Sequence, residues 1–281
     1  MVIIAAAVRF AERICMDDKG PEISAMVMIY NEAWQIRDCL DTIKWVDEIV
    51  ICDSFSDDGT VEICREYTDK IYQRKFDNFA NQKKWMLSKP SNRWGLFVEA
   101  DERFPDTLEE EARSKLQHGD CDGYEMVFHN YCFKWELKGD FWRFKKIKLF
   151  KRDKAHWAER LVHSVMTLDG KVGELKTPVI HLGYVNARHW LRKLNYSSRL
   201  EVLQKFAEGT NYRWWEIVRI PVSFFTVFYR YYFKRQSYKG GLGGFIVSIV
   251  YALYTSFMYT RYFIEKAVRG FMLCRNGGID E

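Results

Sequence analysis

The sequence contains no pair of cysteines at the CxxC spacing. Its seven cysteines are an odd number and lie scattered along the 281 residues. Such a set suits neither a disulfide framework nor a zinc site, and it indicates a reducing compartment. The N-terminal stretch MVIIAAAVRFAERIC also lacks the basic start of a signal peptide, and its apolar run is short. We interpret it as an ordinary strand or helix.

Internal repeats and low-complexity segments are missing as well. The chain is 48% hydrophobic and 29% charged, which is the composition of a folded protein. Its length suits one large α/β domain with an appendage, or two modest domains.

Positive charge is concentrated at the C-terminal end. Residues 211–281 contain ten Lys or Arg and four Asp or Glu, while the whole chain has a formal charge of +5. The first 210 residues are therefore close to neutral. A basic, aromatic tail on a near-neutral body indicates an anionic partner, either membrane lipid or nucleic acid. Because the basic residues alternate with long apolar runs, we expect lipid and no nucleic acid.

Residues 240–260 (GGLGGFIVSIVYALYTSFMYT) carry no charge over 21 positions, which is long enough to span a bilayer. However, the segment starts with glycines, is rich in Tyr and has cations on both sides. The block before it, 214–235, is aromatic, basic and interrupted by Pro221. We therefore expect 211–281 to form helices lying in the headgroup region on the cytoplasmic face of a membrane. The alternatives are a spanning or re-entrant hairpin, and a hairpin packed on the body or forming a homo-oligomer interface.

The first half of the chain alternates between strand and helix patterns. Apolar runs predict strands at 23–30, 47–53, 69–75 and 93–100, and helical spacing predicts helices at 33–44, 59–67 and 79–87. This alternation predicts an α/β fold with a mostly parallel sheet and helices on both faces. From 121 to about 185 the pattern favours antiparallel strands, with Asp169-Gly170 as a turn. An amphipathic helix is expected at 189–208.

Polar residues follow three of the predicted strands. These are Asn31 and Glu32, then Asp53, then the acidic stretch from Glu99 to Glu102. In parallel sheets, ligands bind beyond the carboxyl ends of the strands. Two acids at positions i and i+2, such as Glu99 and Asp101, can direct oxygens toward one Mg²⁺ or Mn²⁺ ion. Asp57 and Asp58, by contrast, we interpret as caps of the next helix.

Several segments together resemble a known family. The ordered runs are MVMIYNE (26–32), IVICDSFSDDGT (49–60), FANQKKWML (79–87) and WGLFVEADERF (94–104). They resemble the inverting glycosyltransferases of family 2, which have the GT-A fold. Later segments are similar to the lipopolysaccharide-core type of bacterial β-glucosyltransferase: FWRFKKIKLFKR (141–152), ERLVHSVM (159–166), VIHLGY (179–184) and the spacing of Lys193, Asn195 and Tyr196. The similarity extends from about Ile23 to Phe263.

The resemblance implies a set of site residues. Asn31 and Glu32 would lie by the nucleotide, Asp53 would contact its uracil or ribose, and Gln82 and Lys83 would lie beside the nucleotide-sugar. Glu99-Ala100-Asp101 takes the place of the DXD motif. This sequence departs from the usual pattern, because its triplet begins with Glu in place of Asp. Asp101 would be the direct ligand of Mn²⁺ or Mg²⁺. The catalytic domain would cover 1–210, with a nucleotide-sugar half at about 23–120 and an acceptor half at about 121–210.

An inverting transfer also needs a general base for the acceptor hydroxyl. Glu159 and Asp140 are candidates for this base. His163 occupies the place of a family histidine that is often followed by Glu, here Ser164, and we consider it a diphosphate or metal contact. Arg143, Lys146 and Lys148 are candidates for binding phosphate, although a basic solvated strand face explains them equally well. His181 and Tyr184 are weaker candidates.

The resemblance therefore implies a metal-dependent transfer of a hexose from a UDP-sugar to a lipid-linked or envelope glycan acceptor. Two alternatives remain at this point. A nucleotidyltransferase could share the sheet and the acidic site, but it would normally have a Gly-rich loop where YNEAWQIRD has no glycine. A catalytically silent membrane-bound scaffold would explain Glu99 and Ser164 as signs of decay.

Overall fold

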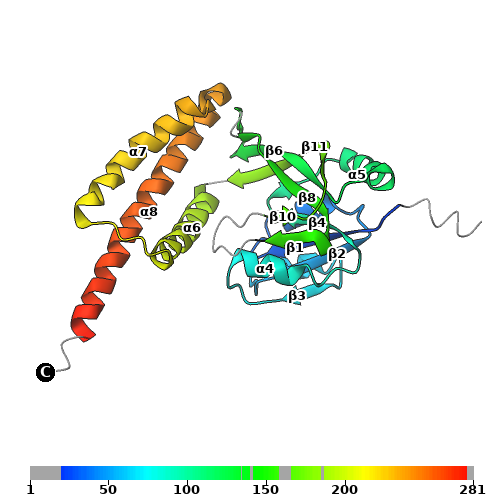
Figure 1. The fold of residues 1–281 in the computed structure, drawn as a ribbon, viewed down its shortest axis with the longest axis horizontal. Coiled ribbons are helices and arrows are strands. Elements are labelled where there is room, and N and C mark those ends of the chain that lie inside the picture. Colours follow the sequence, from blue (N-terminus) through cyan, green and yellow to red (C-terminus); the bar gives the residue numbers. More distant parts are fainter. Residues whose placement is uncertain (1–19, 134, 140–141, 158–165, 185–186, 277–281) are drawn as a thin grey trace, which may run out of the picture.

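The computed structural model describes residues 20–133, 135–139, 142–157, 166–184 and 187–276 (Figure 1). In chain order the elements are β1 (Ile23–Ile29), α2 (Ile36–Asp41), β2 (Glu48–Asp53), α3 (Thr60–Cys64), β3 (Ile71–Gln73), α4 (Phe79–Met86), β4 (Trp94–Glu99), β5 (Glu102–Arg103), α5 (Thr107–His118), β6 (Gly123–Cys132), β7 (Trp135–Glu136), β8 (Lys145–Lys151), η3 (Arg152–Lys154), β9 (Ala155–Trp157), β10 (Met166–Leu168), β11 (Val172–Tyr184), α6 (Ala187–Ala207), η4 (Trp214–Val218), α7 (Arg219–Tyr229), η5 (Arg230–Lys234), η6 (Ser237–Gly240) and α8 (Gly241–Asn276).

Nine of the described strands form one mixed sheet in the order β3-β2-β1-β4-β8-β6-β11-β5, with β7 paired to β6. The first four strands in this order are parallel to one another, as predicted for the first half of the chain. β8 is antiparallel to both β4 and β6. β6 and β11, however, pair in parallel, where the sequence pattern suggests antiparallel hairpins. The predicted α/β class is confirmed, and the sheet as a whole is mixed.

Both faces of the parallel half are buried, which explains the continuous apolar strands. On β1, Ala25 and Val27 pack toward α2 and α5, whereas Met26 packs toward α4 and the β9–β10 ribbon. Helix α5, which the sequence analysis did not identify, buries Leu108, Ala112 and Leu116 at a spacing of four residues. Helices therefore cover both faces, as predicted.

The C-terminal helices project away from the sheet (Figure 1). α7 and α8 lie side by side, and α6 packs on α8. Pro221 lies in the first turn of α7 and does not interrupt it, because the N–H groups of a first helical turn have no partner within the helix. One contact with the sheet is the bond from Trp142 Nε1 to Ser237 Oγ, at 2.9 Å. Beside it, Cys132 of β6 and Val247 of α8 share one apolar cluster with Trp142.

The glycines at the start of α8 permit a close approach of this helix to its neighbours. A Cβ atom on Gly244 would lie 1.6 Å from the backbone oxygen of Ser237, and one on Gly243 would lie 2.4 Å from Trp135 Cβ. A Cβ on Gly240 would meet only ordinary contacts, the nearest at 3.5 Å. The glycine-rich run is therefore explained by helix packing at one end of α8.

Replacing Gly244 should loosen this junction. We expect Gly244→Ala to lower the free energy of unfolding by about 1–3 kcal/mol, because the clashing partner is backbone that cannot rotate away. Gly240→Ala, four residues earlier, should leave stability nearly unchanged. Thermal unfolding of the full chain, followed by circular dichroism, compares the two variants. Equal stability would show that the close approach is not required.

Candidate active site at the acidic turn

The ends of three parallel strands meet at one edge of the sheet. Met28 of β1 stands opposite Glu99 of β4, and Ile29 stands opposite Asp53 of β2. The chain then turns at residues 100–101 before β5 begins. We call Glu99–Glu102 the acidic turn. The predicted convergence of polar strand ends is therefore present in the structure.

The loops that follow β1 and β2 are bonded to each other. Asn31 has a left-handed backbone (φ 55°), which asparagine tolerates better than most residues. Its side chain donates to Asp57 Oδ1 at 2.8 Å and accepts from Asp57 N at 3.0 Å. Asp53 is fully buried and accepts bonds from Ser56 and from Gln73 Nε2. Asn31 and Asp53 thus shape this edge through the two loops.

Asp57 and Asp58 differ from their joint interpretation as caps. Asp58 accepts a bond from Thr60 N at 3.1 Å, but the N-cap residue of α3 is Gly59, without a side-chain cap bond, so the interpretation of Asp58 as the cap is wrong. The interpretation of Asp57 as a cap is also wrong, because the Asp57 side chain bonds to Asn31 and so links the two loops.

The last carboxylate of the acidic turn is held by a buried lysine. Glu102 is fully buried, and Lys148 Nζ of β8 lies 2.5 and 2.6 Å from its two carboxylate oxygens. Burial raises the pKa of Glu102, while the Lys148 ammonium opposes this shift. Glu102 Oε2 also accepts a bond from Glu99 N at 3.0 Å. Lys148 is therefore an internal counter-ion, which corrects its interpretation as a phosphate-binding or solvated residue.

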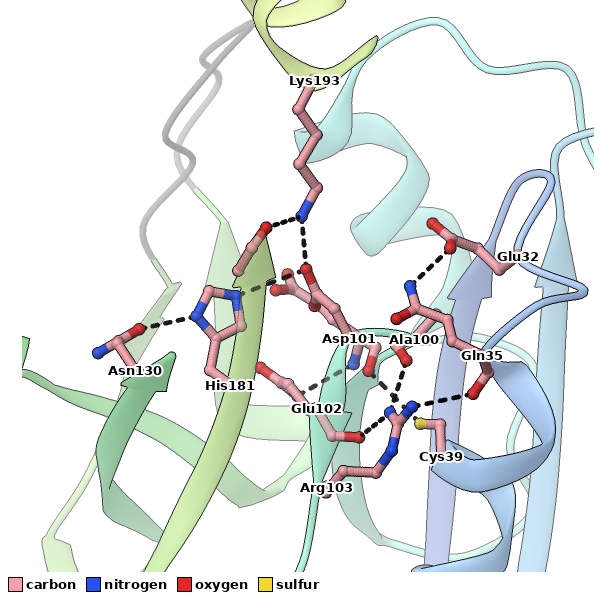
Figure 2. A network of polar contacts seen from close by, with 12 residues as sticks. Glu32, Gln35, Cys39, Ala100, Asp101, Glu102, Arg103, Asn130, His181 and Lys193 are labelled. Carbon is pink, nitrogen blue, oxygen red and sulfur yellow. Dashed lines mark hydrogen bonds and ion pairs between the residues drawn. The ribbon is translucent and has the colours of Figure 1, made fainter. Parts of the chain in front are cut away.

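An arginine fixes the backbone of the same turn. Arg103 Nη1 donates to the carbonyl oxygens of Ala100 and Glu102, at 2.9 and 2.8 Å. Its Nη2 donates to Gln35 O at 3.1 Å, which ties the turn to the segment after β1 (Figure 2). The Ala100 side chain lies in the hydrophobic core. In this structure Ala100 therefore sets the spacing between Glu99 and Asp101.

Helix α4 supplies a second lysine to the acidic turn. Lys83 Nζ lies 3.7 Å from Glu99 Oε1. Burial lowers the pKa of Lys83. Burial alone would raise the pKa of Glu99, but Lys148 and Lys83 lower it to about 2. Gln82 is buried behind Lys83 and donates to Ser54 Oγ at 3.2 Å.

Asp101 has two basic partners, a lysine and a histidine. Its Oδ2 lies 2.6 Å from Lys193 Nζ of α6 and 3.5 Å from His181 Nε2 of β11 (Figure 2). Burial alone would raise the pKa of Asp101, but Lys193 and His181 hold it well below its usual value. Asp101 is therefore an ionised carboxylate in a largely dehydrated position.

The His181 ring is oriented by Asn130. Asn130 Nδ2 donates to the Trp142 carbonyl, which leaves Asn130 Oδ1 facing His181 Nδ1 at 2.7 Å. His181 Nδ1 therefore donates to Asn130 Oδ1, and Nε2 is the ring nitrogen that faces Asp101. Metal-binding histidines typically donate such a hydrogen bond from the ring nitrogen that does not bind the metal. Sequence reasoning ranked His181 low, and no local pattern distinguishes it from a structural histidine on an apolar strand.

Asp101 and His181 therefore fit a divalent cation as two of its ligands. Among the described residues, no group of three or more His, Cys, Asp and Glu could hold a metal ion. Mg²⁺ is usually bound by one or two carboxylates and completed by substrate phosphates, so Asp101 is the main protein ligand that this set offers to such an ion. The donor set therefore fits a cation that binds together with a phosphorylated substrate.

Glu32 lies beside this pair (Figure 2). It accepts a bond from Gln35 Nε2 at 2.6 Å. Burial raises the pKa of Glu32 to about 7, and the Asp101 charge acts in the same direction.

The remaining predicted site residues either have other surroundings than the acidic turn or fall outside the described residues. Asp140, Glu159 and His163 fall outside the described residues. The Arg143 side chain is exposed and lies 4.0 Å from Glu136 of β7, so the structure does not bring it to the acidic turn. Lys146, by contrast, is near the acidic turn: its Nζ lies 5.0 Å from the centre of the Phe128 ring, and its charge helps to lower the pKa of Glu99.

The buried pair of Glu102 and Lys148 should determine whether the acidic turn can fold. Lys148→Met leaves a buried charge without its partner, and we expect a loss of about 3–5 kcal/mol in unfolding free energy. The double variant Glu102→Gln/Lys148→Met should recover most of this loss, because the charge is removed and the amide oxygen can still accept from Glu99 N. Urea denaturation measures both. Equal loss in the single and double variants would contradict this role for the pair.

The chain is similar to several known glycosyltransferases. Lipopolysaccharide core biosynthesis glycosyltransferase LpsC from Rhizobium meliloti is 25% identical over 256 residues, covering 88% of this chain and 94% of LpsC. An uncharacterized glycosyltransferase from Rickettsia felis is 23% identical over 256 residues, covering 82% of this chain and 86% of that protein. The crystal structure of S. aureus TarS residues 1–349 is 15% identical, with a TM-score of 0.44, and covers 89% of this chain and 91% of that one.

A match to a protein-family model identifies the family of this chain. The model described as glycosyl transferase family 2 matches residues 24–167. This segment is just over half of the chain and contains β1, β2, β4 and the whole acidic turn. The chain therefore belongs to glycosyl transferase family 2.

Proposed function

We propose that this enzyme transfers a hexose from a UDP-sugar to a lipid-linked or cell-envelope glycan at a membrane surface. The observation that carries the proposal is the position of Asp101 and His181, with Oδ2 and Nε2 3.5 Å apart, at the edge of the sheet where the parallel strands end. Diphosphate donors need both positive charge and a cation site at this place. Lys83 and Lys193 supply the charge, and Asp101 and His181 supply the site.

Asp101 and His181 would hold Mn²⁺ or Mg²⁺, with Glu99 close by as a further carboxylate. When bound, such a cation neutralises charge on the departing diphosphate as a Lewis acid. The remaining roles follow the strand ends: Asn31, Glu32 and Asp53 would form the nucleotide side of the site, and Gln82 and Lys83 the nucleotide-sugar side. Arg143, which is exposed, remains a candidate for the acceptor side.

The proton of the acceptor hydroxyl needs a base. Glu99 and Glu102 are unsuited, because each carboxylate lies against a lysine ammonium. We therefore retain Glu159 and Asp140 as candidates for the base, and His163 as a contact to diphosphate or metal.

The acceptor proposal rests on similarity and on the tail. LpsC is named for lipopolysaccharide core biosynthesis, an envelope glycan pathway. Among the described residues, one helix segment, Ser237–Arg269, is long and apolar enough to cross a membrane. We divide the chain into a catalytic unit at 1–210 and a membrane-associating unit at 211–281, on the cytoplasmic face.

The tail exposes large apolar side chains on α7, α8 and the short helices η4, η5 and η6. They are Trp214, Trp215, Ile217, Val218, Val222, Phe225, Tyr229, Phe233 and Tyr238 before the glycine run, and Leu242, Phe245, Leu253, Phe257, Ile264 and Val268 after it. Several cations of the tail are used internally: Arg261 binds Asn195, and Lys266 binds Asn211. The exposed aromatic residues, more than these cations, would therefore contact lipid. A homo-oligomer interface would use the same surface.

Asp101 should be essential for binding the donor. We expect UDP-sugars with Mn²⁺ to stabilise the wild-type protein against thermal unfolding, by about 2.7 kcal/mol at a hundredfold excess over Kd. Asp101→Asn should lose this stabilisation, and Glu110→Gln, an exposed acid on α5, should keep it. A panel of nucleotide-sugars in a thermal shift assay gives the comparison. Full donor affinity in Asp101→Asn would contradict the site, and no response of the wild type to any nucleotide-sugar would contradict the function.

Lipid binding should depend on the exposed aromatic residues of the tail. Trp215 and Phe225 are 68% and 69% exposed. We expect Trp215→Glu/Phe225→Glu to reduce partitioning to anionic vesicles at least about tenfold, since each side chain contributes roughly 1.5–3 kcal/mol when buried in an apolar phase. Flotation measures the bound fraction. Phe55→Glu changes an exposed aromatic residue of the catalytic unit and is the control. Equal flotation of the wild type, the double variant and the control would refute anchoring by the tail.

A further inference from the structure

Lys193 reaches the acidic turn from a helix outside the segment matched by the family model. It belongs to α6, and its ammonium lies 2.6 Å from Asp101 Oδ2 and 3.2 Å from the carbonyl oxygen of Gly183 (Figure 2). The side chain is 37% exposed, in contrast to Lys148, which is 3% exposed. Lys193 therefore has access to solvent and room to move, whereas Lys148 has neither.

The ammonium of Lys193 bonds to the same carboxylate oxygen that faces His181. A divalent cation held by Asp101 and His181 would need that oxygen and the space beside it. Two cations cannot share this position without strong repulsion, so binding of one disfavours the other. The geometry thus places a protein cation where the proposed metal would bind.

We propose that Lys193 is a tethered counter-cation that leaves Asp101 when metal and donor bind, and then binds the donor diphosphate. This inference rests on the proposed function. In the transfer, the acceptor hydroxyl oxygen forms a bond to the anomeric carbon and gives its proton to the general base, while the bond between the anomeric carbon and the diphosphate oxygen breaks and leaves its electron pair on the diphosphate. An ammonium released beside that group donates charge-assisted hydrogen bonds to it. Lys193 would thus neutralise Asp101 in the free enzyme and the leaving group during the reaction.

Helix α6 is fixed while the Lys193 side chain is able to move. Two residues along from Lys193, the backbone and side-chain oxygens of Asn195 accept bonds from Arg261 of α8. Further along α6, Glu201 accepts a bond from Tyr254 of α8 at 2.7 Å. Helix α6 is therefore anchored to the tail. The ammonium of Lys193 would move from Asp101 to the diphosphate by rotation of its flexible four-carbon side chain, without a shift of the helix.

Binding of Mn²⁺ and UDP to Lys193→Met tests the exchange. Without nucleotide, we expect the variant to bind Mn²⁺ about tenfold more tightly than the wild type, because the competing ammonium is gone. With saturating Mn²⁺, we expect it to bind UDP about tenfold more weakly, because the diphosphate loses a partner. Electron paramagnetic resonance of free Mn²⁺ and calorimetry of UDP measure the two affinities. Arg192→Met removes a neighbouring exposed charge from the same helix and should change neither.

Opposite signs of the two effects identify the exchange. A purely structural lysine would weaken both affinities on removal, and that result would overturn the proposal. Equal tightening of Mn²⁺ binding in Arg192→Met would also overturn it, because the effect would then come from net charge alone. If the wild type binds no UDP in the presence of Mn²⁺, the proposed function fails. Tighter Mn²⁺ binding in Lys193→Met would even then support the competition at Asp101.

Discussion

The structure depends on neutralising several carboxylates that are gathered at one edge of a sheet. Parallel strands bring Glu99, Asp101 and Glu102 together, and removing such charges from water costs several kcal/mol each unless they are paired. The pairing cations come from α4, β8 and α6, and Arg103 fixes the turn itself. No single stretch of chain can build this site. Its formation requires the parallel half of the sheet, the antiparallel strand β8 and the helix that follows the sheet.

The pairs in this cluster are not equivalent, and burial distinguishes them. Glu102 and Lys148 are inaccessible to solvent, so exchange of either partner would leave an uncompensated charge. In the other pair, Asp101 is 12% exposed and Lys193 is 37% exposed, so water and substrate can reach the lysine ammonium. One pair is therefore suited to hold the turn, and the other to respond to ligands. The same type of interaction serves stability in one position and chemistry in the next.

The sequence predicts those features of the site that leave a pattern in neighbouring residues. Apolar runs ending in Asn31, Asp53 and the acidic turn give the strands, their direction and the edge where the site lies. His181 and Lys193 are 80 and 92 positions beyond Asp101 and have no spacing that relates them to it. Lys148 stands in a basic strand and looks solvated until β4 and β6 are known to cover it. The parallel pairing of β6 with β11 is hidden for the same reason, because contacts between distant segments decide it.

Helix α6 belongs to both parts of the molecule. Its N-terminal half delivers Lys193 to Asp101, while Asn195 and Glu201 are bonded to α8. The tail in turn meets the sheet where Trp142 binds Ser237, and the carbonyl of Trp142 also orients Asn130 and hence His181. Two separate routes therefore connect the tail to the two partners of Asp101. Both partners of Asp101 are thus held by residues that also bond to the tail.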